Sequence, residues 1–161
     1  MNSLVVAVAA ALLVAAAAQA HGPQAHGREP NLEMVETEFG RTGDPKRVTR
    51  TVDIEMLDAM RFKPDSITVR QGDTLRLRVR NTGKMLHELV IGTDKELQEH
   101  AELMKKHPTM EHDEPYMAHV DAGKRNEIVW QFNRPGDFKF ACLIPGHFEA
   151  GMVGTIKVLP R

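Results

Sequence analysis

The chain has a single cysteine, and this scarcity limits the classes of protein to which it can belong. One cysteine in 161 residues excludes an intrachain disulfide, and with it a small fold held together by disulfide bridges. Charge of one sign is also lacking, because 21 Lys and Arg face 22 Asp and Glu, giving a formal net charge of −1. Without a basic block or an aromatic-basic stripe, nothing in the composition indicates a nucleic-acid partner.

The first twenty residues contain no charged side chain. An Ala, Val and Leu run from Leu4 to Ala18 leads into Ala18-Gln19-Ala20, a small-x-small pattern typical of signal-peptide cleavage. The run is shorter than the roughly 20 residues that a membrane span needs. We therefore expect a cleavable signal peptide at 1–20, export to the periplasm and no membrane span in the mature chain. The alternative is an uncleaved anchor, since no Lys or Arg precedes the apolar run.

Beyond the signal, residues 21–47 are polar and rich in Gly, Pro and charge, which predicts a flexible leader. From residue 48 to 161, short segments alternate between apolar and polar residues and are separated by turn residues. The expected strands lie at 48–56, 66–70, 74–80, 86–91, 127–132, 137–142 and 152–159, with 127–132 and 137–142 expected to form a hairpin. This pattern predicts an all-β sandwich as a single domain.

Four side chains have the chemistry and spacing of a metal site. Cys142, His147 and Met152 follow one another at Cys-x4-His-x4-Met spacing, and His87 lies far upstream. One thiolate, two imidazoles and a thioether form the ligand set of a trigonal copper site with a weak axial Met, whereas zinc rarely takes a thioether. Taken separately, the Cys and Met are ordinary core residues and the His a turn residue. That alternative has to explain all four together.

Strand periodicity supports the metal site, because alternate residues of a strand face the same side. Three expected strands each place a ligand on the same parity as core residues. The three sets are Phe138, Phe140 and Cys142; His87, Leu89 and Ile91; and Met152, Gly154, Ile156 and Val158. The turn at Pro145-Gly146 returns the chain toward the cysteine.

The segments Cys142-Leu-Ile-Pro-Gly-His147 and Gly151-Met152-Val-Gly154, with the upstream strand 81–89, resemble the copper-binding segments of cupredoxins, the plastocyanin and azurin family. The resemblance covers about residues 48–159. It implies a Greek-key β-sandwich, one type 1 copper and one-electron chemistry. It also implies His87, Cys142 and His147 as strong ligands and Met152 as the axial one. Within the family, the chain is most similar to periplasmic copper-tolerance cupredoxins.

The residue after the first histidine departs from the family pattern. Many cupredoxins have Asn or a small polar residue there, which ties the two ligand segments together, and this chain has Glu88. By parity, Glu88 faces away from His87. It either forms a hydrogen bond across to the cysteine loop or lies at a solvated edge.

An insert at 93–119 interrupts the strand pattern. Thr93 and Glu96 form a capping box that predicts a helix from Asp94 to about Lys106. The insert contains a set of soft ligands, namely His100, Met104, His107, Met110, His112, Met117 and His119. One interpretation is a second, weaker copper site; the other is a surface insert whose Met residues pack and whose His residues are solvated. His21 and His26 pose the same choice, between an N-terminal Cu(II) site and a polar tail.

Three functions are consistent with these features. The first is a copper-tolerance protein, the second a soluble electron shuttle between periplasmic redox enzymes, and the third an enzyme. A multicopper oxidase or copper nitrite reductase needs further ligands and a second domain, and the chain has no His-x-His pair. We therefore expect no enzyme. For redox exchange we expect an apolar patch around His147, formed by Leu143, Ile144, Pro145 and Phe148, where a partner protein would dock.

Overall fold

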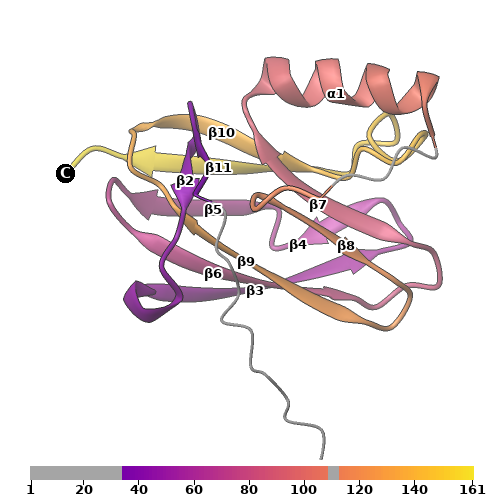
Figure 1. Cartoon of the computed structure of the whole chain (residues 1–161). Coiled ribbons are helices and arrows are strands. Elements are labelled where there is room, and N and C mark those ends of the chain that lie inside the picture. Colours follow the sequence, from indigo (N-terminus) through magenta and orange to yellow (C-terminus); the bar gives the residue numbers. More distant parts are fainter. Residues whose placement is uncertain (1–33, 109–112) are drawn as a thin grey trace, which may run out of the picture. The chain divides into compact units, whose positions relative to one another are not determined.

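A computed structural model describes residues 34–108 and 113–161, and its strands form two sheets packed face to face (Figure 1). In one sheet the order is β1 (Glu36–Thr37), β2 (Gly40–Thr42), β9 (Arg125–Gln131), β6 (Thr74–Asn81), β3 (Arg50–Leu57) and β4 (Arg61–Lys63). In the other the order is β5 (Ser66–Arg70), β11 (Val153–Leu159), β10 (Gly136–Ala141), β7 (His87–Gly92) and β8 (Met117–Val120). The predicted β-sandwich is confirmed.

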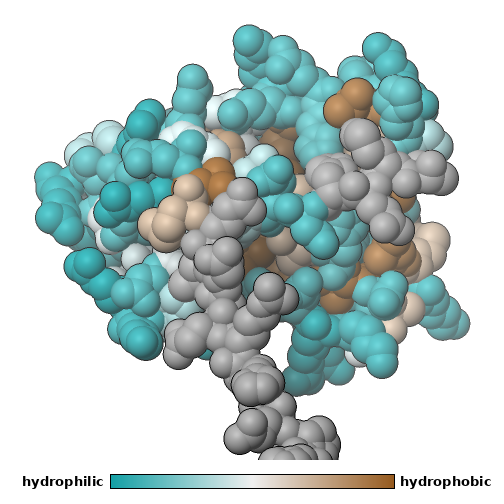
Figure 2. All heavy atoms as spheres, viewed as in Figure 1, coloured by the Kyte–Doolittle hydropathy of each residue, from teal (hydrophilic) through white to brown (hydrophobic). Residues whose placement is uncertain are grey.

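Alternation along the strands builds the core between the sheets. On β6, Leu75, Leu77 and Val79 point inward and are fully buried, while the arginines between them face outward. Trp130, Phe132 and Phe140 are the largest buried side chains, each contributing about 1.5–3 kcal/mol of hydrophobic stabilisation. The face seen in Figure 2 is mostly hydrophilic, as this alternation requires.

The expected hairpin of 127–132 with 137–142 is wrong. β9 pairs with β6 and β2 in one sheet, and β10 pairs with β11 and β7 in the other. The connection therefore carries the chain from one sheet to the other. Its physical reason is that Phe132 and Phe138, on either side of the turn residues, are both buried in the shared core. A tight hairpin would have kept both strands in one sheet.

The flexible leader expected at 21–47 is wrong for its second half. Residues 36–47 form β1, β2 and the 3-10 turn η1 (Pro45–Arg47), and β2 pairs with β9. Phe39 explains this order: its ring stacks on Trp130 at 5.5 Å, and its carbonyl accepts a hydrogen bond from the Trp130 indole. The polar composition of residues 21–47 taken together did not indicate that one aromatic side chain, Phe39, would anchor the segment to the core. Residues 1–33, with the expected signal peptide, lie outside the described residues.

The predicted helix is confirmed as α1 (Asp94–Lys106), with both hydrogen bonds of the Thr93–Glu96 capping box. Its buried face, formed by Leu97, Ala101 and Met104, packs on Val90 of β7 and Ala141 of β10. In Figure 1 the helix covers the outer face of this sheet. Among the described residues, no helix is both long enough and apolar enough to cross a membrane.

The cover provided by α1 makes β7 a strand that is buried on both faces. His87, Leu89 and Ile91 face the core between the sheets, as their parity predicted. Val90 faces the second apolar layer, beneath the helix. Glu88 is therefore enclosed rather than placed at a solvated edge.

Candidate metal centre

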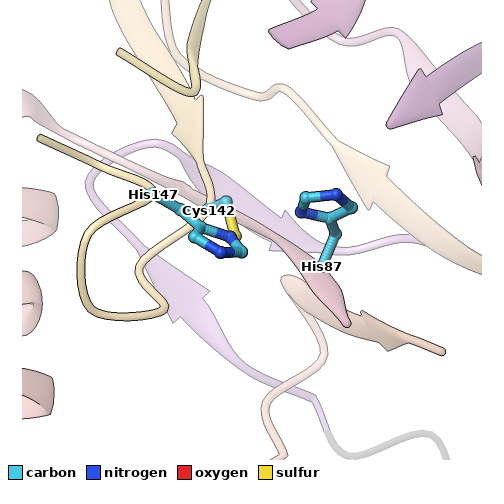
Figure 3. Close-up of side chains that lie close together, drawn as sticks. All are labelled: His87, Cys142 and His147. Carbon is cyan, nitrogen blue, oxygen red and sulfur yellow. The ribbon is translucent and has the colours of Figure 1, made fainter. Parts of the chain in front are cut away.

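His87, Cys142 and His147 lie together at one end of the sandwich (Figure 3). His87 begins β7, Cys142 directly follows β10, and His147 lies in the loop between β10 and β11. One ligand atom from each lies within 4.8 Å of the others, and the Cys142 Sγ is 3.3 Å from the His147 Nδ1. The first two side chains are fully buried and His147 is half-buried. The structure thus brings together three of the four predicted ligands from segments far apart in sequence.

Backbone hydrogen bonds within the loop place Met152 next to Cys142 and His147. The Cys142 amide donates to the Met152 carbonyl at 3.1 Å, and the Met152 amide donates to the His147 carbonyl at 3.0 Å. Gly146 and Gly151 have φ values of 91° and 89°, a region that favours glycine, so both turns of the loop depend on them. Met152 is fully buried in the same core cluster as Cys142, as its parity predicted.

Asp58 orients His87, a contact that sequence reasoning missed. Its Oδ1 lies 3.1 Å from the His87 Nε2, and the amides of Lys84 and Met85 donate to the same carboxylate. These donors, the Lys84 amide first, hold the pKa of Asp58 below its usual value despite partial burial. Since a carboxylate only accepts, this contact selects the tautomer of the neutral imidazole in which Nε2 carries the proton and Nδ1 has the lone pair.

The surroundings of the His87 Nδ1 indicate whether a metal fits this site. It is buried and has no hydrogen-bond partner, which costs free energy unless something else engages the lone pair. A histidine whose other nitrogen donates to a carboxylate is the usual arrangement in metal sites. The donor set of thiolate, two imidazoles and a buried thioether suits copper. The residues present therefore fit a copper ion.

Gly83 leaves room for the Asp58 carboxylate, but a glycine in a turn did not by itself indicate Asp58. A Cβ at this position would lie 1.9 Å from the Asp58 Oδ1, so a side chain here would displace the carboxylate. The turn after an apolar strand gave no reason to connect Asp58 with His87, 29 residues downstream.

The apoprotein keeps both loop ligands electrically neutral. Burial raises the pKa of the Cys142 thiol to about 12, although the Glu88 amide donates to its Sγ at 3.4 Å. Burial, and then the nearby His87, lower the pKa of His147. At neutral pH the imidazole thus offers a free lone pair, whereas the thiol must lose its proton to a metal before it becomes a strong ligand.

Glu88 joins the two ligand segments, which confirms the cross-loop alternative. It is only 1 % exposed, and its Oε1 accepts a hydrogen bond from the Leu143 amide at 2.7 Å. Its Oε2 lies 2.9 Å from the Nε2 of His119, a residue of β8. The carboxylate thus provides the link for which a small polar residue was expected.

The soft ligands of the insert that the structure describes differ in their surroundings. Met104 and Met117 are buried and pack with Leu143, as the packing alternative expected. His107 is exposed, and His119 is engaged with Glu88. Met110, His112, His21 and His26 lie outside the described residues.

The surface around His147 agrees only in part with the predicted apolar patch. Leu143 is buried beneath α1, while Ile144 and Phe148 are half-buried and Pro145 is exposed. His147 is not wholly covered. Next to His87 in sequence, Met85 and Leu86 are 41 % and 45 % exposed.

In the part of the chain that the structure describes, the fold and the donor set are those of a small β-sandwich protein with a buried site suited to copper. Residues 48–159 match the family described as copper binding proteins of the plastocyanin/azurin type. The chain belongs to this family.

Relatives and solved structures agree with this assignment. The chain is 47 % identical to the copper-resistant cuproprotein CopI of Rubrivivax gelatinosus over 92 % of each chain. It is 34 % identical to the protein of the same name from Vibrio cholerae, over 86 % of this chain and 83 % of the relative. An auracyanin B structure superimposes with a TM-score of 0.63 at 22 % identity, covering 75 % of this chain and 96 % of that one. This last likeness shows the fold.

Proposed function

We propose that His87, Cys142, His147 and Met152 bind one copper ion. The observation that carries the proposal is the buried His87 Nδ1, which has no partner and lies with the Cys142 and His147 ligand atoms in one cluster. A bound copper would supply reversible one-electron chemistry between Cu(I) and Cu(II). The chain's own residues orient the ligands and exclude water, and none is proposed as a catalytic acid or base.

In the cell, the proposed role is copper tolerance. The relatives at 47 % and 34 % identity are both named copper-resistant cuproproteins, and they match nearly the whole chain. Residues 1–20 would direct the protein to the periplasm, where copper arrives before it reaches the cytoplasm. A single, deeply buried thiol suits that compartment, because ligation protects it from oxidation.

The alternative function is a soluble electron shuttle. It is favoured by the half-buried ring of His147 and the exposed Pro145 beside it, which leave a route for electrons at the surface. A partner protein would dock there.

Two measurements test the proposal. Titration of the purified chain with Cu(II) should saturate the buried site at one equivalent, with an intense visible band from the cysteine thiolate. In cells, deletion of the gene should reduce growth in raised copper, and the wild-type gene but not Cys142→Ser should restore it. Unchanged growth in copper, together with slower reduction of a periplasmic electron acceptor, would favour the shuttle instead.

A further inference from the structure

Glu88 makes three contacts, two that join β7 to the cysteine loop and one to β8. Its amide donates to the Cys142 Sγ, its Oε1 accepts from the Leu143 amide, and its Oε2 faces the His119 imidazole. A buried carboxylate is costly unless each oxygen has a partner. Two oxygens with two different partners make the position of Glu88 depend on both of them.

His119 is the partner that comes from the insert. It lies on β8 directly opposite Glu88 in the antiparallel pairing, and its side chain is 35 % exposed. Its Nε2 is 2.9 Å from the Glu88 carboxylate, and its Nδ1 is 3.5 Å from that of Asp113. The ring therefore links the buried carboxylate next to the copper ligands to one at the surface.

The insert also contacts the ligand loop at a second point. Lys105, in the last turn of α1, lies 2.7 Å from the Glu149 Oε1, and the other Glu149 oxygen accepts from the Gly146 amide at 2.9 Å. Between the two points, Met104 and Met117 pack on Leu143. The insert, whose composition suggested a second copper site, thus packs against the copper loop, the segment 142–152 that contains Cys142, His147 and Met152.

We propose that His119 is a positioning residue for the copper site, acting through Glu88 to hold the Cys142–Leu143 segment against β7. This inference rests on the proposed function, because its consequence is a change in copper binding. His119 does not contact the ligand atoms. It fixes Glu88, which in turn fixes both the Leu143 amide and the hydrogen bond to the Cys142 Sγ. Partners of this kind tune ligand orientation, and their loss typically weakens metal binding about 10–100-fold.

The test compares His119→Leu, which removes the donor that faces Glu88, with His119→Gln, which keeps a donor for Glu88. We expect His119→Leu to weaken Cu(I) binding about tenfold in a chelator competition and to shift the cysteine-to-Cu(II) band. His119→Gln should recover part of both. Arg78→Gln is the matched control, because it breaks a carboxylate ion pair with Asp53 on the other sheet. It should leave the band and the affinity unchanged.

A double-mutant cycle with Glu88→Gln tests the route of the effect. If His119 acts through Glu88, His119→Leu should weaken copper binding much less in the Glu88→Gln background. Additive effects would overturn this route. A lower melting temperature of the apoprotein with unchanged band and affinity would make His119 merely structural. Absence of the band from the wild-type protein would refute the proposed function itself, so the two failures are distinguishable.

Discussion

Two groups of histidine and sulfur side chains, the copper loop and the insert, are similar in composition and opposite in structure. In the loop, Cys142 and Met152 are fully buried, and Cys142 lies in one cluster with His147 and with His87 of β7, whose Nδ1 has no hydrogen-bond partner. In the insert, Met104 and Met117 are also buried, at 5 % and 8 % exposed, but pack among Val90, Leu97 and other apolar side chains. The difference teaches that a soft ligand is defined by its neighbours. A thioether among apolar groups is part of the core, whereas a thioether in one loop with a thiol and an imidazole is a candidate metal ligand, as proposed for Met152.

Replacing the Cys142 thiol is the strongest test of the difference between the copper loop and the insert. Cys142→Ser should abolish the visible band completely, because the thiolate-to-Cu(II) transition no longer exists. The matched change in the insert, Met104→Leu, should leave the band at full intensity. Absorption of the two variants after addition of one Cu(II) equivalent measures both. An intense band in Cys142→Ser would show that the loop is not the copper site.

The insert should respond to substitution as a core does. Met104→Ala is expected to reduce the free energy of unfolding by about 2–5 kcal/mol, because it removes buried volume and leaves a cavity. Met104→Leu, which conserves volume, should cost less than about 1.5 kcal/mol. Urea unfolding of the apoproteins gives both values. If both variants were equally stable and the wild type took up a second Cu(I) equivalent that Met104→Leu lacked, the second-site interpretation would be right.

Asp58 offers a test on the side of the proposed copper site, because its contact with the His87 Nε2 leaves the Nδ1 lone pair available. Asp58→Asn should weaken copper binding about tenfold, since an amide no longer enforces the tautomer that directs Nδ1 into the site. Asp53→Asn, on β3, the strand that ends just before Asp58, removes a carboxylate paired with Arg78 and serves as control. Chelator competition measures the affinities. Equal affinities in the two variants would show that the Asp58 contact does not orient the ligand.

The proposed ligands could be selected from the sequence because loop spacing and strand parity are patterns of neighbouring residues, and the structure brings His87, Cys142 and His147 into one cluster. The same holds for α1, whose capping box is a four-residue pattern. Asp58 and Phe39 were not predictable, since each acquires its role from a partner on a distant segment, His87 and Trp130 respectively. Glu88 is an intermediate case, because its environment could be predicted only in part. Parity gave its direction, but only the cover from α1 and β8 decided whether that direction was solvent.

The smallest expected effect is a pH dependence that arises in the contact between the two regions. The hydrogen bond to Glu88, as the largest cause, raises the pKa of His119 above its ordinary value of 6.5, and Asp113 adds to this. A histidine whose pKa is higher in the folded state binds protons more tightly there than in the unfolded chain. Its stabilisation is therefore fully present below about pH 6.5 and is lost as the pH rises through the raised value.

The melting temperature of the apoprotein provides the measurement. The difference between the wild type and His119→Gln should be largest at pH 5.5 and should shrink toward pH 8.5 as the imidazole loses its proton, because the neutral ring resembles the amide that replaces it. His107→Gln is the control, because that histidine is exposed at the end of α1 and should show a small difference at both pH values. If the melting-temperature difference stayed constant from pH 5.5 to pH 8.5, the charge of His119 would not strengthen its contact with Glu88. The contact between insert and copper loop would then depend on shape and packing alone.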